Sequence, residues 1–133
     1  MKVLVDTSVW SLALRRNQRV APQAASLSKL VERGDVQMIG PIRQELLSGV
    51  SEPKQFEALK VRLDAFEDIA LEQHHFEKAA EFHNKCRKHG VQGSHTDFLI
   101  CAVASLEGMT IFTTDKDFYS YAKWIPVNLY EPM

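Results

Sequence analysis

Short apolar runs typical of buried strands alternate along the chain with apolar stripes at helical spacing, and this alternation restricts the fold more than any other feature. Strands that alternate with helices form mostly parallel sheets whose two faces are covered by helices. The sequence therefore predicts an α/β fold, a three-layer sandwich with a central, mostly parallel sheet of four to five strands. The expected strands are residues 3–5, 36–39, 68–71, 110–113 and 127–130, of which 68–71 is the weakest.

Segments with apolar residues at helical spacing lie between the expected strands. Apolar residues at intervals of three and four predict helices that end at Gly34 and Gly90, and another between Pro53 and Glu67. Residues 98–106 are apolar almost all round and end at Gly108, as expected of a helix packed inside the molecule. The stripes consist of Ala24, Leu27, Leu30 and Val31; of Phe56, Leu59, Leu63 and Phe66; and of Phe76, Ala79, Ala80, His83 and Cys86.

Length and composition exclude several classes of protein. The 133 residues suit a single domain over residues 1–133, with no repeat or linker-like stretch to divide them. No apolar run approaches the roughly 20 residues of a bilayer span, and Asp6 interrupts the apolar start too early for a signal peptide. Cys86 and Cys101 form no CxxC pair and indicate reduced thiols. We therefore expect a cytoplasmic protein with no membrane association.

Four acidic residues stand where a parallel sheet places its ligands. Asp6 follows the first strand, and Asp115 follows the fourth. Glu45 lies in the first turns of a helix after the second strand, and Asp97 begins the buried helix. In open α/β sheets, ligands bind beyond the carboxyl ends of the strands. Each acid alone has an ordinary interpretation as a helix cap, a dipole partner or a surface residue, but their joint placement favours one shared site.

Such a group of acids needs a cation. Converging carboxylates raise one another's pKa and destabilise a fold unless positive charge offsets them. Carboxylate oxygens suit Mg²⁺ or Mn²⁺, which also bridge to substrate phosphates and activate a water for hydrolysis. We therefore predict that Asp6, Glu45, Asp97 and Asp115 are both metal-binding and catalytic, with Mg²⁺ or Mn²⁺ as the cofactor.

The acids lie in segments that resemble the PIN-domain ribonucleases, and most closely the VapC-type toxins of type II toxin-antitoxin systems. The segments are VLVDTSVW, PIRQELLSG, HTDFLICAVA and IFTTDKDF, in the family's order and at about its spacing. The resemblance spans nearly the whole chain. It implies a PIN-like fold and a metal-dependent endoribonuclease that acts on RNA. It also implies a homodimer and a cognate VapB-like antitoxin whose peptide blocks the cleft.

The resemblance also implies roles for individual residues. It gives metal-binding catalytic roles to the four acids, and Ser8 and Thr114 match polar positions that support the metal ligands by hydrogen bonding. Asp117 matches an acid that is a ligand, a helix cap or a supporting group, and we assign it to the supporting group. Outside these motifs, Arg15 and Arg16 form either an RNA contact or a solvated basic face.

Two other functions fit parts of the pattern. Phosphoryl transfer through an aspartyl intermediate would use Asp6 as the nucleophile, but its motif has a second Asp where this chain has Ser8. A non-catalytic PIN-like domain would bind RNA or serve as a scaffold. Such domains are expected to lose acids from the cleft, whereas all four are present here. The sequence therefore favours hydrolysis of RNA phosphodiester bonds by a metal-activated water.

Overall fold

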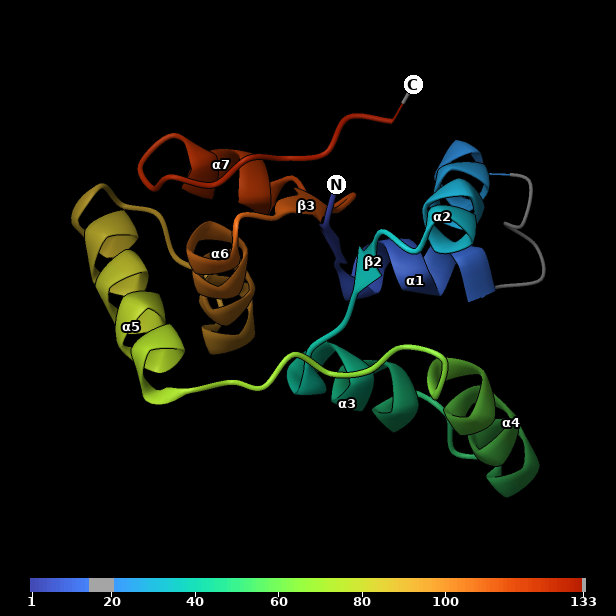
Figure 1. Ribbon diagram of the computed structural model, residues 1–133. Coiled ribbons are helices and arrows are strands. Elements are labelled where there is room, and N and C mark those ends of the chain that lie inside the picture. The colour runs from blue at the N-terminus through green and yellow to red at the C-terminus, as the bar shows by residue number, and fades with distance from the viewer. Residues whose placement is uncertain (15–20, 133) are drawn as a thin grey trace.

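Three short parallel strands lie at the centre of the computed structural model, which describes residues 1–14 and 21–132 (Figure 1). Their spatial order is β2-β1-β3, so the first strand of the sequence is the central one. All three residues of β1 are buried, as expected of a strand covered on both faces. The predicted α/β class with a parallel sheet is confirmed. The strands are β1 (Val3–Val5), β2 (Val36–Gln37) and β3 (Thr110–Phe112).

The sheet is narrower than the sequence predicts. Within the described ranges, the segments 68–71 and 127–130 contribute one parallel bridge each, Asp68 to Met38 and Leu129 to Ile111. The strands that they border are too short to extend these ladders. β2 is only two residues long, and the chain turns into helix α3 at Gly40. The segment 127–130 makes both of its backbone hydrogen bonds to the same residue of β3, Ile111.

Helices cover both faces of the sheet. In Figure 1, α1 and α2 lie on one side of the strands, and α5 and α6 lie on the other. No helix in the described part of the chain has both the length and the apolar character that a membrane span requires. The helices are α1 (Thr7–Leu14), α2 (Pro22–Arg33), α3 (Gly40–Ser48), α4 (Pro53–Leu63), α5 (Gln73–Lys88), α6 (His95–Glu107) and α7 (Asp117–Ala122).

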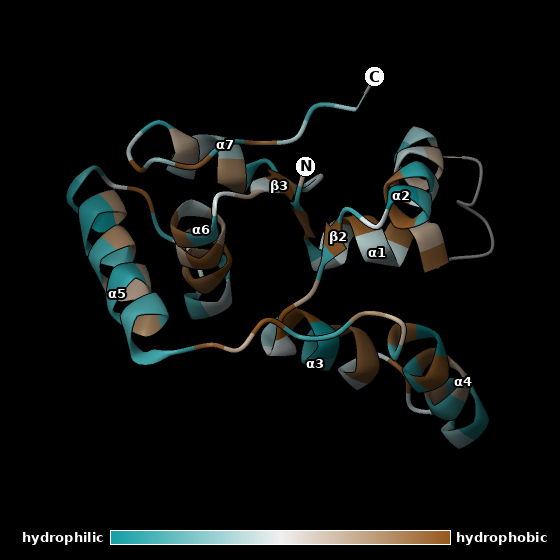
Figure 2. Ribbon diagram, in the orientation of Figure 1, coloured by the Kyte–Doolittle hydropathy of each residue, from teal (hydrophilic) through white to brown (hydrophobic). Residues whose placement is uncertain are grey.

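Helix α6 is the interior helix that the sequence predicts. Every residue of the run 98–104 is buried, and Figure 2 shows hydrophobic residues on this helix where α5 shows many hydrophilic ones. The Ser94 hydroxyl accepts a hydrogen bond from the backbone N–H of Asp97 at 3.0 Å, which caps the first turn. Gly108 ends the helix in the left-handed conformation, with φ of 69°. The apolar body of α6 thereby fixes the position of its polar first turn.

The packed side of helix α5 coincides only in part with the stripe that its apolar spacing predicts, since it keeps Ala79 and Cys86 but not Phe76. Phe76 is 52% exposed, whereas His75, Phe82 and Cys86 are buried. The helix is rotated because His75 finds hydrogen-bond partners for both ring nitrogens in the interior, and a buried polar group is stable when it is so paired. Cys86 and Cys101 are free buried thiols, and burial raises the pKa of both.

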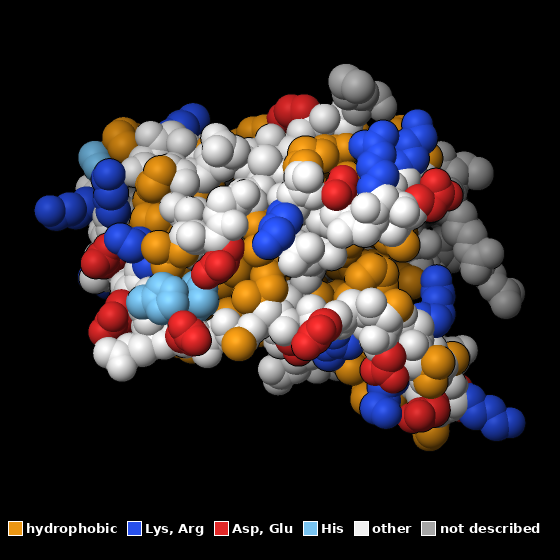
Figure 3. Space-filling view, viewed as in Figure 1, with side chains coloured by type: hydrophobic (Ala, Val, Ile, Leu, Met, Phe, Trp, Pro, Cys, Tyr) orange, Lys and Arg blue, Asp and Glu red, His pale blue; other side chains and the backbone are white. Residues whose placement is uncertain are grey.

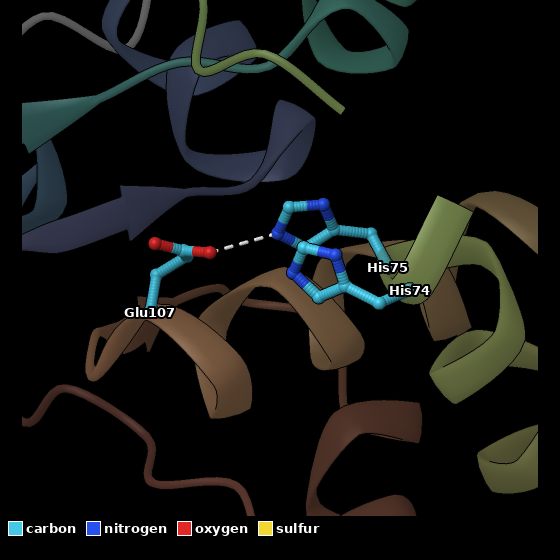
Figure 4. A group of neighbouring side chains, drawn as sticks. All are labelled: His74, His75 and Glu107. Carbon is cyan, nitrogen blue, oxygen red and sulfur yellow. Dashed lines mark hydrogen bonds and ion pairs between the residues drawn. The ribbon is translucent and has the colours of Figure 1, made fainter. Parts of the chain in front are cut away.

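The buried His75 links the start of α5 to the end of α6. Its Nδ1 accepts the backbone N–H of Glu72 at 3.0 Å, and its Nε2 lies 2.8 Å from Oε2 of Glu107 (Figure 4). Ligand atoms of His74, His75 and Glu107 also lie within 4.8 Å of one another, a spacing that suits a metal. However, an Nδ1 that accepts an N–H leaves the proton on Nε2, which then donates to Glu107. The group is therefore a structural link, not a metal centre.

Arg43 on α3 holds the chain between α4 and α5. Its guanidinium donates to the Asp68 carboxylate through Nε at 3.0 Å and to the Leu63 carbonyl through Nη1 at 3.0 Å. Nη2 donates to the Phe66 carbonyl. Leu63 is the last residue of α4, so Arg43 donates to one carbonyl group that has no partner within that helix and to a second one beyond its end.

We expect Arg43→Ala to lower the free energy of unfolding by about 2 kcal/mol, because carbonyl groups and a carboxylate lose their donor. Arg43→Lys should recover only part of the loss, since an ammonium group cannot reproduce the planar set of donors. Urea denaturation measures both variants. Arg87→Ala, at an exposed position, is the control and should change stability by less than about 0.5 kcal/mol. Wild-type stability of Arg43→Lys would contradict this account.

Candidate active site

The carboxyl ends of β1 and β3 meet at one edge of the sheet, and Asp6 lies there. Its backbone N–H donates to the carbonyl of Phe112, the last residue of β3, at 2.9 Å. The side chain is buried, with the residue 6% exposed. Oδ2 accepts hydrogen bonds from the hydroxyls of Ser8 and Thr113, each at 2.8 Å. Neutral donors therefore hold a buried carboxylate at the edge where the sequence predicts the site.

Thr113 supplies the hydroxyl that the sequence analysis assigned to Thr114. Besides donating to Asp6, Oγ1 of Thr113 accepts the backbone N–H of Asp115 at 3.0 Å. Thr114 is exposed and contributes its backbone N–H, which donates to Oγ of Ser8 at 3.0 Å. Side chains alternate along an extended segment, so Thr113 and Thr114 point to opposite sides. Ile111 and Phe112 are both buried, so the sequence pattern alone does not identify Thr113.

Three further carboxylates gather beside this edge. Asp97 comes from the first turn of α6, Asp115 from the segment after β3, and Asp117 from the start of α7. One carboxylate oxygen from each lies within 4.8 Å of the others. Oδ1 of Asp115 also accepts the backbone N–H of Asp117 at 2.9 Å, which sets the turn into α7. The sequence predicts a supporting role for Asp117, whereas the structure places its carboxylate within the group itself.

The environment of Asp97 opposes its negative charge. Burial is the largest cause that raises the pKa of its carboxyl above the usual value, and the charges of Asp6 and Asp115 raise the pKa further. Hydrogen bonds to Tyr121 and Ser94 act in the opposite direction. The net direction is upward, so ionised Asp97 destabilises the metal-free fold. A divalent cation at this position would offset that cost.

Glu45 lies next to the group but not within it. It is exposed on α3, and its Oε1 accepts the hydroxyl of Thr7 at 2.8 Å. Thr7 directly follows Asp6, so this bond ties the side chain to the edge of the sheet that carries the site. Among the described residues, Glu45 is outside the set of carboxylates within 4.8 Å of one another. Arg15 and Arg16, the expected RNA contacts, lie outside the described residues.

Two hollows with apolar linings run along the side of the molecule between α1–α2 and α3–α4. Figure 3 shows hydrophobic side chains in this region of the surface. One hollow, of about 380 Å³, is lined by residues such as Trp10 and Leu27, and the other, of about 520 Å³, by Leu46 and others. Leu14 and Arg62 line both, so the hollows adjoin. Glu45 lines the second hollow, which therefore extends towards the acidic site.

Comparisons with known proteins agree with this fold. The model of the PIN domain family matches residues 3–123. FitAcB from Neisseria gonorrhoeae is similar in structure, with a TM-score of 0.80, 23% identity and coverage of 98% of this chain and 97% of that chain. VapBC2 from Rickettsia felis, bound to a DNA fragment from its promoter, has a TM-score of 0.79, 17% identity and 98% coverage of both chains. Among curated proteins, none matches the sequence.

We expect Thr113→Val to lower the free energy of unfolding by about 1–3 kcal/mol, because the Asp6 carboxylate loses a donor and the Asp115 N–H loses its acceptor. Thr113→Ser keeps the hydroxyl and should retain most of the stability. Thr114→Val is the matched control, since it removes an exposed threonine hydroxyl and leaves the backbone N–H in place. Chemical denaturation in EDTA measures all three variants. Equal losses for the two valine variants would contradict the assignment to Thr113.

We expect Asp97→Asn to raise the melting temperature without metal by about 3 °C, because it removes a charge that burial and neighbouring carboxylates disfavour. The pKa of Asp97 is raised on folding, so wild-type stability should fall as the pH rises through that pKa, and the variant should lose this dependence. Thermal unfolding in EDTA across pH measures both effects. Glu57→Gln, at an exposed acid on α4, is the control. A lower melting temperature for Asp97→Asn would contradict the electrostatic account.

Proposed function

The chain belongs to the PIN domain family, and from this premise we propose that it is a metal-dependent endoribonuclease, the toxin of a type II toxin-antitoxin pair. PIN domains are generally nucleases. The observation that carries the proposal is the group of Asp97, Asp115 and Asp117 beside the buried Asp6 at the carboxyl edge of the sheet. The VapC-like motifs of the sequence contain or adjoin each of these residues.

The donor set suits Mg²⁺ or Mn²⁺. Asp97, Asp115 and Asp117 offer carboxylate oxygens within 4.8 Å of one another, and hard divalent cations prefer oxygen ligands. We assign the binding of the cation to these three residues with Asp6, and a catalytic role at the rim of the site to Glu45. When bound, the cation would polarise a phosphoryl oxygen and lower the pKa of a water. The chain itself orients the acids through fixed hydroxyl and N–H donors.

The two alternative functions have less support. Phosphoryl transfer through Asp6 as the nucleophile would need a second Asp where this chain has Ser8, and the Ser8 hydroxyl instead donates to Oδ2 of Asp6. A scaffold without catalysis has no need for clustered carboxylates that destabilise the fold. Burial, and to a smaller extent the charges of Asp6 and Asp115, raise the pKa of the Asp97 carboxyl, and such a perturbed acid at a sheet edge favours a functional site.

RNA as the substrate is supported by a groove beside the acids. The groove lies between α5 and α6, has a volume of about 330 Å³, and has Thr96, the neighbour of Asp97, in its lining. Aromatic rings on both helices line it, and aromatic side chains stack on the unpaired bases of single-stranded RNA. The rings of Phe76 and His95 are exposed and that of His83 is half-buried, whereas Phe98 forms the buried floor of the groove.

An antitoxin is the proposed protein partner. The structural relatives are VapBC and FitAB assemblies, and the sequence resembles the VapC component. The adjoining hollows between α1–α2 and α3–α4 offer an apolar surface for a partner peptide, with Arg62 placed to pair with a carboxylate. Since Glu45 lines this surface, a peptide bound there extends towards the acidic site and would block it. The homodimer stays a prediction, which light scattering after size-exclusion chromatography would test.

We expect the purified chain to cleave total RNA with Mg²⁺ or Mn²⁺ and leave 5′-phosphate and 3′-hydroxyl ends, and EDTA should abolish cleavage. Asp115→Asn should lower the rate by about 100-fold or more, because it removes a proposed metal ligand. Asp64→Asn, at an exposed acid after α4, is the matched control and should keep full activity. Cleavage that persists in EDTA would contradict metal dependence. Binding of RNA without cleavage under any divalent cation would favour the scaffold function.

A further inference from the structure

Tyr121 on α7 contacts the acidic site although it belongs to none of the motifs in the sequence. Its hydroxyl donates to Oδ2 of Asp97 at 2.7 Å. The tyrosine is fully buried, and a buried tyrosine hydroxyl needs a hydrogen-bond partner. Here the partner is one of the carboxylates that we assign to cation binding. Because one carboxylate oxygen is bonded to the tyrosine, the rotation of the Asp97 carboxylate about its bond to the side chain is fixed.

Aromatic packing holds the tyrosine ring in place. The ring centroid lies 4.8 Å from that of Phe98, the residue after Asp97 on α6. It lies 5.2 Å from the centroid of Phe118 in an edge-to-face arrangement. Both phenylalanines are buried. A ring confined on two sides cannot follow a displaced carboxylate, so the tyrosine sets the position of Asp97 and not the reverse.

Gly93 provides the space for the tyrosine hydroxyl. A β-carbon at position 93 would overlap the hydroxyl oxygen of Tyr121 and would lie 2.7 Å from Cζ. No side chain larger than that of glycine fits there unless the ring moves. Gly93 precedes Ser94, the residue that caps α6, so the loop that starts the helix packs directly on the tyrosine. The backbone at 93 and the first turn of α6 therefore enclose the hydroxyl from two sides.

We propose that Tyr121, seated against Gly93, is a positioning residue for the divalent cation: it orients Asp97 so that the carboxylates of Asp97, Asp115 and Asp117 converge before the ion arrives. The inference rests on the proposed function for the identity of the site. Groups that orient metal ligands without touching the metal typically contribute 10- to 100-fold to metal affinity. The same hydrogen bond costs nothing at the moment of binding because the fold has already made it.

Tyr121→Phe tests the inference, because it keeps the packed ring and removes only the hydroxyl. We expect the affinity of the folded protein for Mn²⁺, measured by isothermal titration calorimetry, to fall about tenfold. For RNA cleavage at a fixed Mn²⁺ concentration below saturation, kcat should fall while KM for RNA stays unchanged. Tyr119→Phe is the matched control, since it removes a hydroxyl from an exposed tyrosine of the same helix. It should leave both quantities at their wild-type values.

Gly93→Ala gives an independent test of the positioning role, and it replaces the first test if Tyr121→Phe does not fold. Its β-carbon displaces the hydroxyl, so Mn²⁺ affinity should fall in the same direction. A purely structural role for the tyrosine would lower the melting temperature and leave the Mn²⁺ affinity of the folded protein unchanged. Wild-type affinity in these variants would overturn the inference. A wild-type chain that binds Mn²⁺ but cleaves no RNA would overturn the proposed function instead, and the affinities would still decide the positioning role.

Discussion

Electrostatic repulsion among carboxylates at one edge of the sheet is the constraint around which this structure is organised. Burial raises the pKa of the Asp97 carboxyl most, and the charges of Asp6 and Asp115 raise it further. Such a group tends to push the ends of its own strands and helices apart. The buried strand β1 holds Asp6 in place and the interior run of α6 holds Asp97, because moving Asp6 or Asp97 would pull apolar side chains out of the core.

The fold orients these acids with neutral donors. Ser8 and Thr113 donate to Asp6, and Tyr121 donates to Asp97. Within residues 1–14 and 21–132, no salt bridge joins a lysine or arginine to any acid of the group. A basic side chain would hold a carboxylate equally well but would also neutralise it. Hydroxyls fix the geometry and leave the negative charge uncompensated, which is the arrangement that a cation site requires.

Local sequence patterns predict the elements that contain a long apolar run or an acid at a fixed place after a strand. The apolar run of α6, which ends at Gly108, predicts an interior helix, and the position of Asp6 and Asp115 follows from the polarity of parallel strands. Features that depend on a few residues or on distant contacts were not predictable in this way. Two adjacent threonines follow β3, and only the contact with the distant Asp6 distinguishes Thr113 from Thr114.

Contacts between distant segments explain the remaining differences from the sequence-based picture. His75 is buried on the core face of α5 because Glu107 lies opposite it. The sequence of α5 itself contains no signal that predicts this distant partner. Gly93 and Tyr121 are separated by a helix, a strand and a turn, so no local pattern connects them. Sheet width was overestimated for a related reason: the apolar runs at 68–71 and 127–130 are present, but the strands beside them are too short to pair with.

The short helix α7 completes the site, since it carries both an acid and the donor for another acid. Asp117 and Tyr121 are four residues apart and therefore lie on the same side of the helix, with the buried Phe118 as its anchor in the core. The other acids of the site are Asp6, Asp97 and Asp115, so the site draws on nearly the full length of the chain. No early portion of the sequence contains a complete group of carboxylates. A site built in this way forms only when α7 has docked, so the binding of a cation there would depend on the completeness of the fold.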